Sequence, residues 1–321
     1  MKQSIYKQFA AMLLWARSLI QLLLRKILLR VSSIDALTLA NIETNDLTSQ
    51  HAALLHKKRL AIPVSFTTLL HYRTQQQTIA GKKLPDRHIN DKLIGQRIAR
   101  AAGMKTPEIY QEMVPNKSIK LRNNCVIKPF HNARSSGVFI YRNRKEIWDV
   151  QAKKGIASVD ELRQRLASFD DDRWIVEELI SQPDGSLARD IKFYCCYGKV
   201  VLVLEKNNAD ETCFWLPDNT PVDPGKYPKN KQFIGSGFRE EDIVAVESLS
   251  HQLPVVFMRI DCLDDGEQLV FGEFTPQPGN YHRINKQTDR MLGQEYIAAQ
   301  QRLEDDLING KSFDAYHNNI K

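Results

Sequence analysis

The sequence predicts an α/β fold of the α+β kind, in a chain of 321 residues that is long enough for two or three subdomains. Short apolar runs recur in pairs around turn residues such as Asp264-Asp-Gly266, which is typical of antiparallel hairpins. Between these pairs, apolar residues recur at helical spacing, as at Leu93, Ile94 and Ile98. The composition, 42% hydrophobic and 26% charged, is that of an ordinary globular protein.

Turn residues and apolar spacing place the individual elements along the chain. Helices are expected at about 47–59, 63–76, 90–103, 145–168, 239–252 and 288–308. Strands are expected at 125–127, 138–141, 174–180, 189–198, 200–204, 254–261 and 269–275. Residues 206–240 are rich in Asn, Asp, Pro and Lys, and we interpret this long excursion as a candidate substrate lid.

The basic character of the chain belongs to its N-terminal end. Residues 1–34 contain six Lys and Arg and no acid, so that +7 minus +6 leaves a charge of +1 for the remainder. A body so close to neutral argues against a nucleic-acid partner. The five cysteines are odd in number and scattered, without a C-x-x-C spacing, which indicates a reduced compartment and neither a disulfide framework nor a zinc site.

Residues 8–29 have the pattern of a basic amphipathic helix. Phe9, Met12, Leu13 and Ala16 begin an apolar stripe, whereas Arg17 interrupts the apolar run and would cost about 2.5–3.5 kcal/mol in mid-bilayer. No small-residue cleavage site follows, which argues against a signal peptide. The pattern favours a helix lying on an anionic membrane surface. Packing on the protein's own core is the alternative, and a true membrane span fits less well.

A lysine between two expected strands is a candidate phosphate ligand. Lys128 ends the run Val126-Ile-Lys-Pro129, and the small-residue loop Ser135-Ser-Gly137 precedes the next strand. An ammonium group is a point charge for phosphate oxygens, and small residues let backbone N–H groups approach them. For this stretch alone, an ordinary surface hairpin with a solvated lysine is an equally good interpretation.

Two carboxylates on neighbouring strands form a candidate metal site. The turn at Asp264-Asp-Gly266 brings Asp261 and Glu273 near each other. Oxygen ligands without His or Cys are those that Mg²⁺ selects, and substrate phosphates complete its shell. A solvent-facing acid pair is the alternative. Glu177 and Glu178 are adjacent on one strand, so that alternation puts them on opposite faces and they are not an acid–base couple.

Several of these segments resemble, in the same order, the motifs of the ATP-grasp superfamily and in particular of its TupA-like branch, found in surface-polysaccharide biosynthesis. The resemblance covers roughly residues 85–300. The matching segments are Asp91-Lys92 with Gly103 and Pro107, Val126-Ile-Lys-Pro129 with Ser135-Ser-Gly137, Glu177-Glu178, Asp190-Ile-Lys192, Arg259-Ile-Asp261 and Gly272-Glu-Phe-Thr-Pro-Gln-Pro-Gly279. Many superfamily members carry Asn two residues after the metal Glu, where this chain has Thr275, as in the TupA-like branch. The phosphate loop is also poorer in glycine than is usual.

The resemblance implies an ATP-grasp fold, in which two α+β subdomains hold the nucleotide, and it implies roles for individual residues. Lys128 and Lys192 would hold the ATP phosphates, assisted by Lys92 and by the loop of Ser135, Ser136 and Gly137. The adenine would lie against Glu177, Glu178 and Leu179, and Asp190 near the ribose or Mg²⁺. The metal ligands would be Asp261, Glu273 and Thr275. Arg259, with Lys192, would be catalytic and stabilise the transferred phosphoryl group. The acceptor would be bound by Asn280, His282 and Arg283, for which polar residues of an ordinary loop are the alternative interpretation.

The resemblance also implies the domain organisation. Residues 1–34 would be the basic helix, 35–115 an N-terminal region before the ATP-grasp fold, 116–180 the nucleotide-binding subdomain and 181–321 the C-terminal subdomain with the metal site.

The function implied is that of an ATP- and Mg²⁺-dependent carboxylate–amine ligase that forms an amide through an acyl phosphate. TupA-like proteins are associated with attaching amino acids or peptides to uronic acids of cell-surface glycans. We therefore expect an amine and a carboxylate-bearing glycan of the cell envelope or capsule as partners, and a cytoplasmic location, peripheral to the inner face of the membrane. A kinase acting on a glycan hydroxyl and a non-catalytic nucleotide-binding adaptor are the two alternatives.

Overall fold

The computed structural model describes residues 64–131, 135–169 and 173–320. By contacts the chain divides into residues 1–63 and residues 64–321, and only the second unit is described below. The expected helices at 8–29 and 47–59 lie outside the described residues. Within the described part, no helix is both long enough and apolar enough to cross a membrane.

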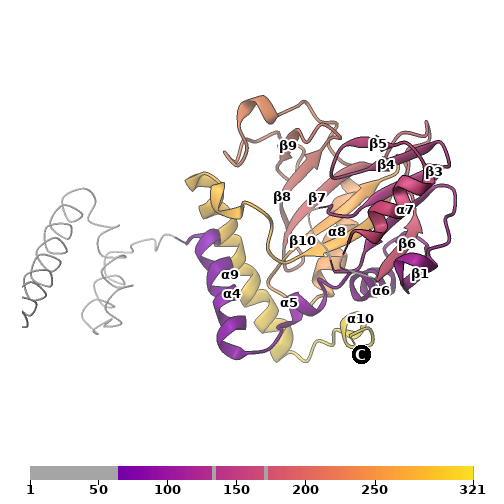
Figure 1. Cartoon of the computed structure of the whole chain (residues 1–321). Helices are drawn as coiled ribbons and strands as arrows, with labels where there is room; N and C mark the ends of the chain where they lie inside the picture. Colours follow the sequence, from indigo (N-terminus) through magenta and orange to yellow (C-terminus); the bar gives the residue numbers. More distant parts are fainter. Residues whose placement is uncertain (1–63, 132–134, 170–172, 321) are drawn as a thin grey trace, which may run out of the picture. The chain divides into compact units, whose positions relative to one another are not determined.

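The first layer is a six-stranded antiparallel sheet with the order β1-β6-β2-β3-β4-β5 (Figure 1). Its strands are β1 (Ile109–Val114), β2 (Cys125–Pro129), β3 (Phe139–Asn143), β4 (Glu146–Asp149), β5 (Lys154–Ile156) and β6 (Trp174–Glu178). Helix α7 (Val159–Ala167) buries Leu162 and Leu166 in the same apolar cluster as Ile127 and Val176. Because side chains alternate along a strand, the neighbouring residues of β2 and β6 face away from α7.

The helix expected at 145–168 is wrong over its first half. The chain there forms β4 and β5, and only α7 is helical. Residues 146–149 are alternately exposed and buried, which is the period of a strand and not of a helix. A left-handed residue at Lys153 then turns the chain into β5, and the Ser158 hydroxyl accepts a hydrogen bond from Glu161 N to begin α7.

The second layer is a five-stranded antiparallel sheet with the order β11-β10-β7-β8-β9. Its strands are β7 (Arg189–Cys196), β8 (Val200–Lys206), β9 (Thr212–Trp215), β10 (Phe257–Asp264) and β11 (Leu269–Thr275). Helix α8 (Glu240–His251) covers one face, since Cys195 interacts with Ser250 and Cys262 with Asp242. The alternate residues of β7 and β10 therefore face away from α8. Strand β10 continues three residues beyond its expected end at Asp261.

The remaining helices surround this sheet (Figure 1). They are α4 (Phe66–Ala80), α5 (Pro85–His88), α6 (Lys92–Ala101), α9 (Lys286–Ile308) and α10 (Asp314–His317), with single 3₁₀ turns at η1 (Asn116–Ser118), η2 (Lys229–Lys231) and η3 (Tyr281–Arg283). Helices α4 and α9 lie side by side, with Gly293 of α9 against the backbone of Val64 and Phe66. Thr67 N and Oγ1 both donate to Asp289 Oδ1 at 2.8 Å, which fixes the start of α4 on α9.

Helix α6 links the two sheets. Asp91 accepts hydrogen bonds from Leu93 N and Ile94 N at 3.0 Å, and the chain leaves the helix through Gly103 in the left-handed region. Its Gly95 lies so close to Phe274 of β11 that an added Cβ would stand 3.3 Å from that side chain. Strand β1, which follows α6, pairs with β6 in the six-stranded sheet, so α6 is held between both layers.

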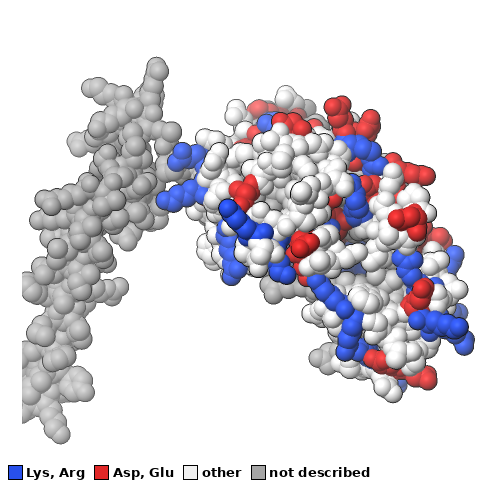
Figure 2. Space-filling model, turned by 90° about the horizontal axis from the view of Figure 1, so that it is seen from above, with Lys and Arg blue, Asp and Glu red and all other residues white. Residues whose placement is uncertain are grey.

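Figure 2 shows Lys and Arg interspersed with Asp and Glu on the face that it draws. This mixture agrees with the charge of +1 that the sequence leaves outside residues 1–34.

Candidate active site

The two expected metal ligands stand directly opposite each other. Asp261 of β10 is paired with Glu273 of β11, next to a bulge between Asp261 and Cys262. Gly272 allows the two strands to approach here, because an added Cβ would lie 3.0 Å from the Asp261 carbonyl oxygen. Asp261 is buried and solvent reaches Glu273, so the pair has one buried and one accessible carboxylate.

Two cations hold Asp261. Arg259 donates from Nε to Oδ1 and from Nη2 to Oδ2, both at 2.6 Å, and Lys192 Nζ lies 3.0 Å from Oδ2. Burial alone would raise the pKa of the Asp261 carboxyl, but the charges of Arg259 and Lys192 outweigh it and lower the pKa below the usual range. Asp261 is therefore ionised at neutral pH despite its burial.

Lys192 is shared by two carboxylates. Its Nζ also lies 2.7 Å from Asp190 Oδ1. Burial opposes the charged form, yet Asp190 and Asp261 together raise the pKa of Lys192 above its ordinary value. At Glu273 the balance is reversed, since desolvation by the surrounding protein and the charge of Asp261 raise the pKa of that carboxyl. A carboxyl group whose pKa is raised beside an ionised carboxylate forms a place where an added cation is stabilising.

The phosphate lysine expected on β2 has a carboxylate partner from β6. Lys128 Nζ lies 2.5 Å from Glu177 Oε1, and Gln96 of α6 donates to Glu177 Oε2 at 2.9 Å. The charge of Lys128 partly offsets the raised pKa of Glu273, so the face of the six-stranded sheet that carries Lys128 is turned toward β11. The expected alternation holds: Glu177 is buried, whereas Glu178 lies on the other face and accepts from Glu108 N. Sequence reasoning missed the Lys128–Glu177 pair.

In the segment expected to hold adenine, two backbone N–H groups already donate to carbonyl oxygens of the protein. Glu178 N donates to Glu108 O at 2.9 Å, and Leu179 N donates to Asn124 O at 3.1 Å. The adenine role of residues 177–179 stays a prediction, and any contact by these two amides would need a rearrangement.

Lys92 and the small-residue loop lie at the end of β2. Lys92 Nζ donates to the carbonyl oxygens of Pro129 at 3.1 Å and Phe130 at 2.8 Å, so it fixes the chain where β2 ends. Ser135 and Gly137 have positive φ, and Ser136 lies in the same turn. Gly137 is required there, because an added Cβ would lie 3.0 Å from the Phe169 ring. Their contacts with phosphate stay predictions.

The donor set fits Mg²⁺ and fits zinc poorly. Among the described residues, no three His, Cys, Asp or Glu side chains come together as a metal cluster. Two opposed carboxylates, one of them accessible, suffice for Mg²⁺, which keeps waters and takes its remaining ligands from substrate phosphates. Thr275, the third expected ligand, accepts from Arg259 Nη2 at 3.2 Å, so it also helps to orient that guanidinium.

The expected acceptor residues lie on an exposed turn. Asn280, His282 and Arg283 are exposed in and next to η3, directly after β11. Asn285, two residues after Arg283, is the N-cap of α9. Its backbone N also donates to Pro224 O at 2.6 Å, which attaches the 206–240 excursion to the start of that helix. The excursion brings Lys226 to the site face, a residue that sequence reasoning missed because no local pattern marks it.

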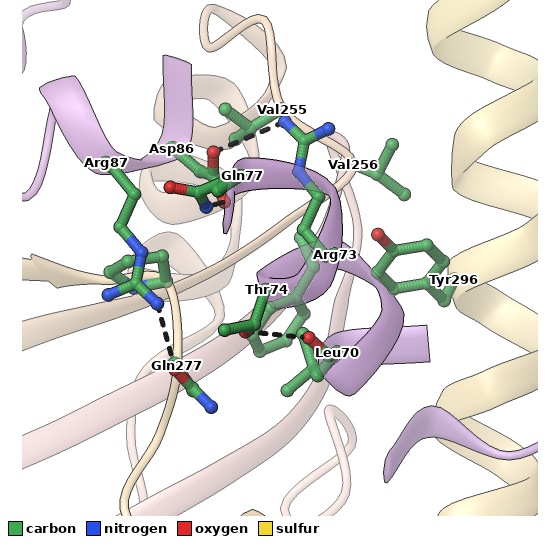
Figure 3. A pocket seen from close by; sticks show the side chains of 12 residues that line it. Leu70, Arg73, Thr74, Gln77, Asp86, Arg87, Val255, Val256, Gln277 and Tyr296 are labelled. Carbon is green, nitrogen blue, oxygen red and sulfur yellow. Dashed lines mark hydrogen bonds and ion pairs between the residues drawn. The ribbon is translucent and has the colours of Figure 1, made fainter. Parts of the chain in front are cut away.

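A small polar cavity lies where α4 and α5 meet the start of β10 (Figure 3). Arg73 and Gln77 point toward Asp86, to which both hydrogen bond at 3.3 Å, and Arg87 donates to Gln277 Oε1 at 2.9 Å. The cavity volume of about 20 Å³ is enough for one water molecule. We therefore interpret it as an internal polar contact and not as a substrate site.

The chain is similar to one protein family and to several solved structures. A family model described as TupA-like ATP-grasp matches residues 69–297. Similar solved structures include the ATP-grasp ligase PsnB with a phosphomimetic variant of its minimal precursor, Mg and ADP, at 13% identity and a TM-score of 0.43, covering 79% of this chain and 76% of that one. D-alanine–D-alanine ligase from Bacillus anthracis has 17% identity and a TM-score of 0.42, covering 68% of this chain and 69% of that one.

Among curated proteins, none matches the chain. The family match covers well over half of the chain and includes every site residue named above, and it confirms the resemblance inferred from the sequence motifs and the expected α+β fold class. The protein belongs to the TupA-like ATP-grasp family.

Proposed function

We propose that the protein is an ATP- and Mg²⁺-dependent ligase that joins a carboxylate to an amine through an acyl phosphate. The observation that carries the proposal is the Asp261–Glu273 pair, opposed on β10 and β11 and flanked by Lys192 and Arg259. Membership of the ATP-grasp family supports the reaction class, and the related ligase PsnB was solved with Mg and ADP.

In this proposal Mg²⁺ would be held by Asp261 and Glu273, and when bound it would supply positive charge to the phosphate oxygens. Lys192 and Lys128 would contact the ATP phosphates from the two sheets. The Arg259 guanidinium would stabilise charge on the transferred phosphoryl group, because its planar fork is already fixed by Asp261 and Thr275. A fixed donor needs little reorganisation as charge develops.

The substrates in this proposal are an amino acid or other amine and a carboxylate-bearing sugar of a cell-surface polysaccharide or its precursor. The family and the basic sequence of residues 1–34 support it, since such a glycan is built on a membrane-bound carrier. The protein would then work at the inner face of the membrane. Release of phosphate that requires both an amine and a uronate distinguishes a ligase from a kinase, which would leave phosphate on the sugar.

Thermal unfolding with AMPPNP and Mg²⁺ tests the site. A ligand at 100 times its Kd adds about 2.7 kcal/mol to the stability of the folded state. We expect wild type to gain a Mg²⁺-dependent increase in Tm, Glu273→Gln to lose the Mg²⁺ dependence, and Glu267→Gln, an exposed acid in the β10–β11 turn, to behave as wild type. The absence of any increase in wild type at millimolar nucleotide would overturn the proposal.

A further inference from the structure

A buried lysine from the long excursion reaches the site face of the five-stranded sheet. Lys226 is only 4% exposed, and its Nζ donates to Tyr194 Oη at 2.8 Å. Tyr194 belongs to β7, two residues after Lys192 and on the same face. An ammonium group has three N–H donors, and Tyr194 takes one of them.

The backbone around Lys226 is fixed on both sides. Pro224 O accepts from Asn285 N, and the Tyr227 ring stacks on Phe214 of β9 with 6.1 Å between the centroids. Gly225, with a φ of +70°, lies against the Asn285 side chain, where an added Cβ would stand at 3.2 Å. The position of Lys226 is therefore set by packing on both neighbours in the chain.

No carboxylate neutralises Lys226 at close range. Among the residues that the structure describes, none of the ion pairs within 4.0 Å includes it. The groups that face it are Tyr194 of β7, its neighbour Tyr227, and Arg259 and Asp261 of β10. A buried ammonium without a counter-ion is costly, and ionisable groups perturbed in this way cluster at functional sites.

The location of Lys226 relative to Asp261 and Glu273 indicates which ligand supplies the missing negative charge. On β7 and β10 the pair Lys192–Asp261 is followed by the pair Tyr194–Arg259, one step of about 6.6 Å along the strands. Lys226 lies over the Tyr194–Arg259 pair, because its Nζ donates to Tyr194 Oη. It is therefore next to the place proposed for the terminal phosphate of ATP, on the side of Arg259 and of the turn at residues 280–283 that leads to Asn285.

We propose that Lys226, together with Tyr194 and Arg259, binds the carboxylate that accepts the phosphoryl group. This inference rests on the proposed ligase function and names the subsite for its acid substrate. In the step concerned, a carboxylate oxygen bonds to the γ-phosphorus of ATP while the bond to the bridging oxygen of ADP breaks, which gives an acyl phosphate and ADP.

The charge state of Lys226 fits this role at neutral pH. Burial, with a contribution from Arg259, lowers its pKa to about 8. The ammonium is then mostly protonated at pH 7 and mostly neutral at pH 9. A carboxylate bound by Lys226 should therefore bind about tenfold more weakly at pH 9 than at pH 7. A general base would show the opposite dependence, with activity that rises through pH 8.

The test is a titration with D-glucuronate in the presence of saturating Mg²⁺ and AMPPNP, with D-glucose as the same ring without the carboxylate. We expect wild type to bind glucuronate and not glucose, Lys226→Arg to bind within a few fold of wild type, and Lys226→Met to lose at least tenfold in affinity and to be insensitive to pH between 7 and 9. Lys229→Met, an exposed lysine of the same excursion, serves as the matched control.

Equal glucuronate affinity in wild type and Lys226→Met, equal affinity for glucose, or no glucuronate binding by wild type would each overturn the inference. The Mg²⁺-dependent Tm increase with AMPPNP is read separately in every variant. Its loss in wild type would be a failure of the proposed function. Its presence in Lys226→Met shows that the variant is folded, so that a changed glucuronate affinity reports on the subsite.

Discussion

Arg259 holds both oxygens of Asp261 at 2.6 Å, from a position two residues away on the same strand. Asp261 is buried, the Arg259 side chain is 12% exposed, and Lys192 contacts Asp261 from the neighbouring strand. Desolvating two charges is compensated only when their geometry is good, and this bidentate geometry is the one that a guanidinium and a carboxylate make best. This bidentate ion pair thus also orients the proposed catalytic arginine of the candidate site.

Arg259→Met should reduce the free energy of unfolding by about 3–5 kcal/mol, because it leaves the buried Asp261 with Lys192 as its remaining partner. Adding Asp261→Asn should recover part of this loss, so the two effects should differ from their sum by at least about 1 kcal/mol. Urea denaturation of the two single variants and the double variant measures the coupling. Arg144→Met, at an exposed position in the β3–β4 turn, should stay within about 0.5 kcal/mol of wild type. Strict additivity of the two changes in unfolding free energy would show that the interaction between Arg259 and Asp261 contributes nothing to stability.

The adjacent residues Glu177 and Glu178 provide a second test. Glu177→Gln should lower the stability of the nucleotide-free protein by about 2–3 kcal/mol, since Lys128 loses its charged partner in a buried setting. Nucleotide phosphates can replace that partner, so the Tm increase with Mg²⁺ and AMPPNP should be larger in Glu177→Gln than in wild type. Glu178→Gln, which removes an acceptor on the opposite face, should change both quantities little. If the Tm increase with Mg²⁺ and AMPPNP is instead smaller in Glu177→Gln than in wild type, then Glu177 orients Lys128 for ATP and does not take the place of the nucleotide phosphates.

The sequence predicts best those elements whose signals are local. The Asp91 cap and Gly103 bound α6, and the turn at 264–266 joins β10 to β11, so the opposition of Asp261 and Glu273 follows from neighbours in the chain. Strands β4 and β5 were missed because they are short and polar, and their pairing with β3 decides their structure over the helix-forming residues that surround them.

The contacts that the sequence could not predict join residues far apart in the chain. Lys128 and Glu177 meet because β2 pairs with β6, and that register depends on the whole six-stranded sheet. Lys226 meets Tyr194 only because residues 216–238 fold back over β7 and β8, a path that no turn signal specifies. Site residues carried by motifs are thus recoverable from one sequence, whereas partners supplied by sheet register or by long loops are not.

Gly293→Ala tests the packing of α9 on α4. In the middle of an isolated helix this change would stabilise by about 1 kcal/mol. Here the added Cβ would lie 2.9 Å from Val64 O and from Phe66 N, both backbone atoms that cannot rotate away. We therefore expect a loss of about 1–3 kcal/mol in urea denaturation. The exposed neighbour Gln294→Ala should be neutral or slightly stabilising. An increase in stability for Gly293→Ala would mean that the two helices separate at little cost.

The depressed pKa of Lys226 predicts how the stability of the protein depends on pH. Its pKa is about 8 in the folded state, against 10.5 for an exposed lysine. Between these two values the unfolded chain binds more protons at this site than the folded chain, so the contribution of Lys226 to folding stability increases as pH rises from 8 to 10.5. Over the full interval this amounts to about 3 kcal/mol.

Lys226→Met removes that contribution and keeps a side chain of similar length. The variant should therefore lose stability relative to wild type as pH rises, with the difference changing by about 2 kcal/mol between pH 8 and pH 10. Comparing the two proteins at each pH cancels the titration of buried groups away from Lys226, such as the Cys195 thiol, whose pKa is raised by burial. Urea denaturation at pH 8, 9 and 10 measures the difference, with Lys229→Met as the control whose difference from wild type stays constant. If the free energy of unfolding of Lys226→Met differs from that of wild type by the same amount at every pH, Lys226 is not desolvated in solution. The argument from its buried charge to a carboxylate subsite would then be wrong.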